Sequence, residues 1–119
     1  MSRYHFHIIG NMEMKEAVTA LSALAHESRL GVYRLLVTAG PEGMAAGAIA
    51  DALRLPPATL SFHLKELSRA RLAISRQEGR YVIYSANFGN ALKLVNYLTE
   101  NCCGGQSCLP ECAPAAETG

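Results

Sequence analysis

The most chemically reactive residues of this 119-residue chain are four cysteines near its C-terminal end: Cys102, Cys103, Cys108 and Cys112. No cysteine precedes them in the sequence. Thiolate sulfur binds soft metal ions and is also the nucleophile of redox chemistry. The grouping therefore indicates that this tail binds a soft ion or responds to a redox signal.

The cysteines are not needed to hold the rest of the protein together. Half of the residues are hydrophobic, which is enough to build a core in a single domain of this length. The apolar stretch from Tyr4 to Gly10 is too short for a signal peptide core or a membrane span, and His5 and His7 interrupt it. We therefore predict a cytoplasmic protein with no membrane partner, in which thiols stay reduced.

Positive charge is concentrated in one part of the chain, although the net charge is only +1. Residues 54–80 carry six Lys or Arg side chains against two Glu, whereas the segments before and after are slightly acidic. A local basic region of this kind is typical of a surface that binds the phosphates of nucleic acid.

Apolar side chains at helical spacing predict four helices before this basic region ends. Gly40-Pro41 ends the second helix, and Pro56-Pro57 separates the third from the fourth. A tight turn followed by a helix with exposed polar and basic residues is typical of a helix-turn-helix. The four predicted helices span residues 13–25, about 26–38, about 45–54 and about 57–70.

The second half of the chain predicts a hairpin and a last helix. Residues 72–85 alternate between apolar and polar side chains around Gly79, which predicts two antiparallel strands. Asn87 can cap a helix over 88–101 whose apolar residues cover more than one face, so we expect it to pack against a second subunit. The expected domains are a flexible arm over 1–12, a DNA-binding and dimerisation domain over 13–101, and a cysteine-rich tail over 102–119 that binds a soft ion or responds to a redox signal.

The expected fold is mainly α with a two-stranded wing, a winged helix-turn-helix that forms a homodimer. Four runs of the sequence carry a recognisable pattern: Leu24-Ala25-His26-Glu27-Ser28-Arg29-Leu30, Ile49-Ala50-Asp51-Ala52-Leu53, Leu60-Ser61-Phe62-His63-Leu64-Lys65-Glu66-Leu67 and Glu78-Gly79-Arg80-Tyr81-Val82-Ile83-Tyr84. Through these runs the chain resembles, over residues 16–101, the ArsR/SmtB family of metal-responsive repressors. The resemblance implies a homodimeric repressor, not an enzyme, that leaves double-stranded operator DNA when an inducer binds.

Two ligand patterns of that family are missing from this sequence. The helix before the turn has no cysteine, unlike that of many arsenic-responsive members, and the last helix has no histidine, unlike that of the zinc-responsive members. The run Glu100-Asn101-Cys102-Cys103-Gly104 instead resembles the arsenic repressors whose ligands lie at the end of the last helix. This branch implies trivalent arsenic or antimony as the inducer, with no organic cofactor.

Trivalent arsenic and antimony are soft centres that favour three thiolates. Cys102, Cys103 and Cys108 can supply them, because Gly104 and Gly105 permit the chain to reverse toward the helix end. Neighbouring side chains on a helix point roughly 100° apart, so binding through Cys102 and Cys103 is expected to distort the last helical turn. Cys112 is either spare or a substitute ligand.

Other interpretations of the tail remain open. A zinc- or cadmium-responsive repressor would use Cys112 as a fourth thiolate, a redox switch would form a disulfide, and a reactive tail would have no designed ligand. A DNA-binding module without ligand control is a further alternative. An enzyme such as a thiol-based reductase would need a cysteine in an activating pocket, which a mobile acidic tail does not offer.

The DNA contacts are expected from the fourth helix and the wing. The residues assigned to base edges are Thr59, Ser61, Phe62 and His63, and those assigned to phosphates are Lys65, Arg69, Arg76 and Arg80. Arg80 beside the Gly79 tip is the expected wing contact, to the minor groove or to the backbone.

Overall fold

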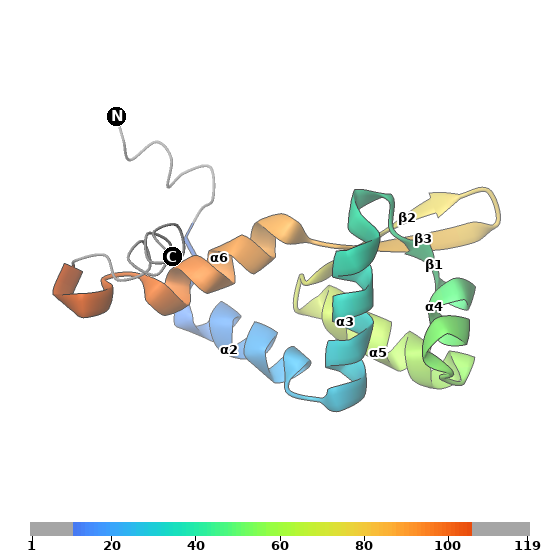
Figure 1. The fold of residues 1–119 in the computed structure, drawn as a ribbon, viewed down its shortest axis with the longest axis horizontal. Coiled ribbons are helices and arrows are strands. Elements are labelled where there is room, and N and C mark those ends of the chain that lie inside the picture. The colour runs from blue at the N-terminus through green and yellow to red at the C-terminus, as the bar shows by residue number, and fades with distance from the viewer. Residues whose placement is uncertain (1–10, 106–119) are drawn as a thin grey trace, which may run out of the picture.

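The computed structural model describes residues 11–105 and arranges them as helices around a small antiparallel sheet (Figure 1). The helices α2 and α6 lie side by side at one end, and the hairpin of β2 and β3 projects at the other (Figure 1). The elements are α2 (Met14–Leu24), α3 (Glu27–Ala39), η1 (Gly40–Glu42), β1 (Met44–Ala45), α4 (Ala46–Leu53), α5 (Pro57–Arg69), β2 (Ala73–Glu78), β3 (Tyr81–Ala86), α6 (Phe88–Thr99) and η2 (Cys102–Gly105).

This order confirms the predicted winged helix-turn-helix, and the first four helices begin and end within two residues of their predicted bounds. The helix starts follow local sequence signals. Pro57 occupies the first turn of α5, where its missing N–H costs nothing. The side chain of His26 caps α3 by accepting the backbone N–H of Arg29, and the Asn87 side chain caps α6 by accepting that of Asn90.

The core lies where α3, α4 and α5 meet the sheet. The predicted inner face of α5, made of Leu60, Leu64 and Leu67, is fully buried. Leu36 of α3 and Ile49 of α4 are buried in the same cluster. Burying one such side chain contributes about 1.5–3 kcal/mol, so this contact fixes how α5 sits on the rest of the domain.

The sheet has one strand more than the two predicted from the sequence. The strand order is β1-β3-β2, and the two-residue strand β1 pairs Met44 with Tyr84 and Ala45 with Ile83. Gly43 leads into β1 with φ +72, and a Cβ there would collide with the carbonyl oxygen of Tyr84. Only glycine permits this close approach of backbone to backbone, which holds the wing against η1 and α4.

Both ends of the described region differ from expectation. Met12, which was assigned to the N-terminal arm, is 7% exposed and belongs to the core. At the other end α6 stops at Thr99, because Glu100 is extended and Asn101 adopts a left-handed φ of 59°. Cys102 and Cys103 therefore follow the helix and do not occupy its last turn. The premise that both cysteines stand on an intact helical turn is therefore wrong, and the effect of ligand binding on that turn stays a prediction.

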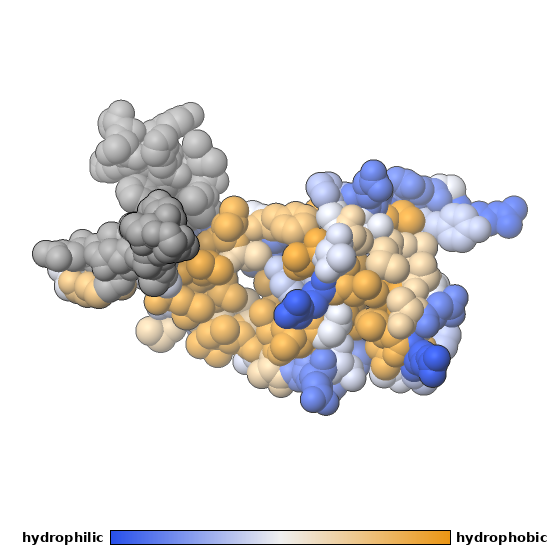
Figure 2. All heavy atoms as spheres, viewed as in Figure 1, coloured by the Kyte–Doolittle hydropathy of each residue, from blue (hydrophilic) through white to orange (hydrophobic). Residues whose placement is uncertain are grey.

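An apolar surface covers the end of the molecule formed by α2 and α6. Figure 2 shows hydrophobic residues gathered on this end, whereas the tip of the wing is hydrophilic. Among the helices within residues 11–105, none combines the length and the apolar character that crossing a bilayer requires. The exposed side chains of this surface, called here the α2–α6 face, are Met14, Val18, Leu21, Leu92, Val95 and Leu98.

Candidate nucleic-acid interface

The helices α4 and α5 form the helix-turn-helix. Arg54 ends α4 in the left-handed conformation with φ 54°, and the N–H of Leu55 bonds the carbonyl oxygen of Ala50 at 3.0 Å. This closing of α4 by a left-handed residue turns the chain sharply into Pro56 and α5. The leucine face of α5 is buried against the core, so the opposite face is presented to solvent.

Three of the four residues assigned to base edges lie on this exposed face. Thr59, Ser61 and Phe62 are exposed, whereas His63 is only 4% exposed. The burial of His63 differs from the expectation that it reaches base edges. Its position was readable from the sequence, because residue 63 follows Leu60 by three and therefore falls on the buried side of the helix.

The surroundings of His63 lower its pKa. Burial is the main cause, because it disfavours the charged imidazolium, and the charges of His26 and Arg29 act in the same direction. The ring centroids of His26 and His63 lie 4.9 Å apart. Nη1 of Arg29 lies 3.3 Å from Nδ1 of His63. A guanidinium can only donate, so His63 is a neutral acceptor in this contact.

Arg29, which no motif in the sequence marked as part of the site, links three parts of it. Its Nε donates to the carbonyl oxygen of Ala23 at the end of α2, at 2.7 Å. Its guanidinium carbon lies 5.7 Å from the centre of the Phe62 ring on α5. Arg29 therefore joins α2 and α3 to the exposed face of α5.

The four cations assigned to phosphates differ in what already binds them. In the described part of the chain, the exposed side chains of Lys65 and Arg80 make no hydrogen bond or ion pair. Arg69 forms an exposed ion pair with Glu66, 3.0 Å long, of a kind that contributes little to stability and exchanges easily. Lys65 and Arg80 are therefore the better candidates for phosphate contacts.

Arg76 is held by the protein itself. Its Nη2 donates to the carbonyl oxygen of Glu42 at 2.8 Å, and its Nε donates to the Glu78 carboxylate at 2.7 Å. Glu42 ends η1, 34 residues before Arg76, so this side chain braces the wing against the loop that precedes β1.

The wing places Arg80 at its tip. Gly79 takes a left-handed φ of 63°, as a tight hairpin turn requires, and Glu78 pairs with Tyr81 across it. The hairpin projects beyond the body of the molecule, as Figure 1 shows. The Arg80 side chain is exposed there, so it remains a candidate for a phosphate contact.

Two of the four cysteines come directly after the C-terminal end of α6. Cys102 and Cys103 begin the short η2 segment, whereas Cys108 and Cys112 lie outside the described residues. Within residues 11–105, no three His, Cys, Asp or Glu side chains come together as a metal site. The predicted set of three thiolates includes one residue beyond that range.

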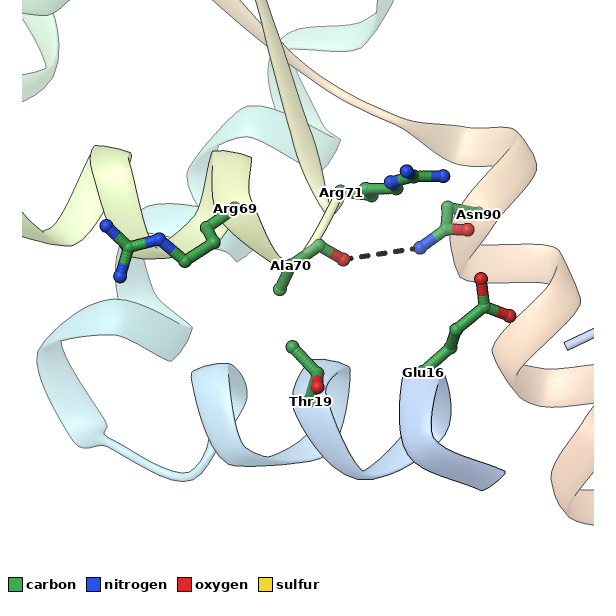
Figure 3. Close-up of a pocket in the computed structure, with 6 residues that line it drawn as sticks. All are labelled: Glu16, Thr19, Arg69, Ala70, Arg71 and Asn90. Atoms are coloured by element: carbon green, nitrogen blue, oxygen red, sulfur yellow. Dashed lines mark hydrogen bonds between the residues drawn. The ribbon is translucent and has the colours of Figure 1, made fainter. Parts of the chain in front are cut away.

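Two asparagines join α6 to the end of α5. Nδ2 of Asn87 donates to the carbonyl oxygen of Arg71 at 3.0 Å, and Nδ2 of Asn90 donates to that of Ala70 at 3.4 Å. Figure 3 shows the Asn90 bond at the edge of a cavity of about 180 Å³ between α2, α5 and α6. We call these two bonds the asparagine clasp. The cavity is lined by Glu16, Thr19, Arg69, Ala70, Arg71 and Asn90.

Comparisons with known proteins found relatives that share this sequence pattern and this fold. A family model described as a helix-turn-helix domain matches residues 24–76. Nodulation protein NolR of Rhizobium meliloti is 34% identical over 80 residues, which cover 67% of this chain and 63% of that protein. The crystal structure of NolR from Sinorhizobium fredii is 32% identical, covers 77% of this chain and 88% of its own, and has a TM-score of 0.59.

A third comparison is with a homodimeric winged helix-turn-helix DNA-binding domain from Mycobacterium bovis, described as a possible ArsR-family transcriptional regulator. It is 26% identical, with a TM-score of 0.60, and covers 74% of this chain and 82% of its own. The chain is therefore similar in sequence and fold to winged helix-turn-helix regulators, one of which is described as a possible ArsR-family member. The helix-turn-helix match runs from the end of α2 into β2, so it includes α5 but neither α6 nor the cysteines of this protein.

Proposed function

We propose that this protein is a homodimeric repressor of an arsenic-resistance operon that releases its operator when trivalent arsenic or antimony binds. The observation that carries the proposal is the position of α6. One end of this helix is joined to the exit of α5 by the asparagine clasp, and the other end leads into Cys102 and Cys103.

The DNA-binding part of the proposal rests on the exposed face of α5. Thr59 and Ser61 carry hydroxyl groups that can reach base edges in a major groove, and Lys65 lies one turn further along. Arg80 on the wing reaches a neighbouring part of the backbone. Phosphate contacts then position the protein, and α5 reads the bases.

The homodimer part rests on the α2–α6 face. Monomeric proteins rarely expose so many large apolar side chains together, and a two-fold dimer would bury the same face of both subunits. The M. bovis domain of the same fold is a homodimer. In such a dimer the two α5 helices face the same side and can enter successive major grooves of one operator.

The inducer part rests on the chemistry of cysteine sulfur in its reduced, thiolate form. Cys102, Cys103 and Cys108 would hold arsenite or antimonite, and methylarsenite would need only two of them because its methyl group occupies one position. Binding would reorganise the short segment after Thr99, move α6 within the dimer and act on α5 through the clasp. Repression would be relieved because the two α5 helices would no longer match the operator spacing.

A zinc- or cadmium-responsive repressor that adds Cys112 as a fourth ligand is the second candidate, because four thiolates suit a tetrahedral ion. A titration of the protein bound to labelled operator DNA separates the two functions. Arsenite and antimonite should release the DNA at concentrations where zinc and cadmium do not. Release by zinc alone would replace the proposal with the second candidate.

A further inference from the structure

A phenylalanine stands among hydroxyl side chains on the exposed face of α5. Phe62 is 55% exposed, next to Ser61 and one turn from Thr59. More than half of this aromatic side chain is exposed to water in the free protein, so apolar surface is left for a partner to cover if α5 enters a groove of DNA. Hydrogen bonding cannot supply that partner, because the ring has no polar group.

The Phe62 ring has two neighbouring side chains that restrict its orientation. The Arg29 guanidinium lies 5.7 Å from its centre, within the range of a cation–π contact, and the His63 ring centroid lies 5.8 Å away. Arg29 is itself fixed by its bonds to the Ala23 carbonyl oxygen and to His63 Nδ1. The orientation of Phe62 is therefore set by groups from α2, α3 and α5.

One base in the major groove offers an apolar partner to such a ring. Thymine carries a 5-methyl group there, and phenylalanine is among the side chains that contact it. We propose that Phe62 is a specificity-determining residue that reads a thymine methyl group in each half-site, and that Arg29 is the positioning residue that holds its ring. This inference rests on the proposed function, because it requires α5 to enter a major groove.

The first step of the test is a selection of binding sites from random double-stranded DNA with the full chain. The selected half-site should contain a thymine at a constant position. Replacing that thymine by deoxyuridine removes only the methyl group, and it should weaken binding about fourfold per half-site, the effect of exposing one methyl-sized apolar group.

The second step compares variants by their thymine-to-uracil affinity ratio. Phe62→Ala should bring the ratio close to one. Arg29→Gln should also lower it, because the ring loses its fixed neighbour, whereas Arg34→Gln on an exposed site of the same helix should leave it unchanged. The ratio is measured on one protein preparation with two DNAs, so a loss of folded protein does not alter it. A merely structural role of Arg29 would weaken binding to both DNAs equally.

Three results would overturn the inference. They are a selected site without a constant thymine, a uracil effect that survives in Phe62→Ala, and an Arg29→Gln ratio equal to that of the parent. Failure of the DNA-binding part of the proposed function, on which this inference rests, is distinguishable from these, since in that case the parent protein would select no DNA at all.

Discussion

The side-chain amide of Asn87 donates to the carbonyl oxygen of Arg71, 3.0 Å away, while its own oxygen accepts the N–H of Asn90. One residue therefore caps α6 and ties it to the exit of α5. The two roles can be separated by mutation, because aspartate keeps the capping oxygen and removes the donor.

Asn87→Asp should leave repression intact and weaken the response to inducer. The ratio of DNA affinities without and with arsenite should move toward one, from the roughly 5- to 150-fold range typical of allosteric coupling. Asn96→Asp makes the same change further along α6, where no bond to the α5 exit is present, and should behave like the parent. Equal ratios in both variants would exclude the clasp from the coupling.

Lys65→Ala and Arg80→Ala should each weaken DNA binding and reduce the salt dependence of log K by about one unit of slope, because each removes one phosphate contact. Binding isotherms between low and moderate salt measure this directly. A slope that equals the parent's would remove that residue from the contact surface.

Arg76→Ala should behave differently from Arg80→Ala, although both remove an arginine from the wing. Arg76 is bound to the Glu42 carbonyl oxygen and the Glu78 carboxylate, so its loss frees the wing instead of a phosphate. We expect faster amide hydrogen exchange in β2 and β3, weaker binding and a nearly unchanged salt slope. Slow exchange together with a reduced slope would show that Arg76 contacts phosphate.

His63 should make folding stability depend on pH. Burial and the charges of His26 and Arg29 lower its folded pKa, so as pH falls the unfolded chain binds this proton first. The stability that depends on neutral His63 is complete above its unfolded pKa of about 6.5 and is lost as pH falls from there through the folded pKa.

The variant that checks this is His63→Asn, because asparagine retains an acceptor for Arg29 and does not titrate. It should be less stable than the parent near neutral pH, since it is smaller, but its unfolding free energy should fall less steeply below about pH 6.5. Urea unfolding at several pH values measures both. Parallel pH profiles for the two proteins would contradict the assignment.

Val95→Glu should convert the proposed dimer to a monomer at micromolar concentration, because each subunit would bury an unpaired carboxylate in the interface. Val37→Glu makes the same change at an exposed valine of α3, outside the α2–α6 face, and should remain a dimer. Sedimentation velocity distinguishes the species. The parent should also bind two half-sites about 10 base pairs apart, and a monomeric parent would exclude the homodimer.

The sequence predicted those parts of the fold that depend on local spacing. Leu60, Leu64 and Leu67 gave the buried face of α5 correctly, and Pro57 gave its start. The same spacing also predicts that His63 is buried. Its polar ring was instead assigned to the exposed side of the helix. The strand β1 was missed because two residues show no alternation, and its pairing depends on Tyr84, 40 residues later.

The candidate site was harder to predict from the sequence than the fold, because several of its contacts join distant segments of the chain. Arg29 meets His63 across 34 residues, and Arg76 meets Glu42 across the same separation. No periodicity encodes these pairs, since they follow from how α3 and η1 pack on α5 and the wing. The end of α6 at Thr99 depends on the left-handed conformation of Asn101. The spacing of apolar residues does not predict this backbone conformation.

Fluorescence anisotropy of labelled operator DNA during an arsenite titration tests whether Cys102, Cys103 and Cys108 together release the DNA when they bind trivalent arsenic. The parent protein and Cys112→Ser should release the DNA, whereas Cys102→Ser, Cys103→Ser and Cys108→Ser should bind it normally and fail to release it. Methylarsenite should still release Cys108→Ser, because two thiolates suffice for it. If only Cys112→Ser failed to respond to arsenite, or if all four variants responded like the parent, the three-thiolate account would be contradicted.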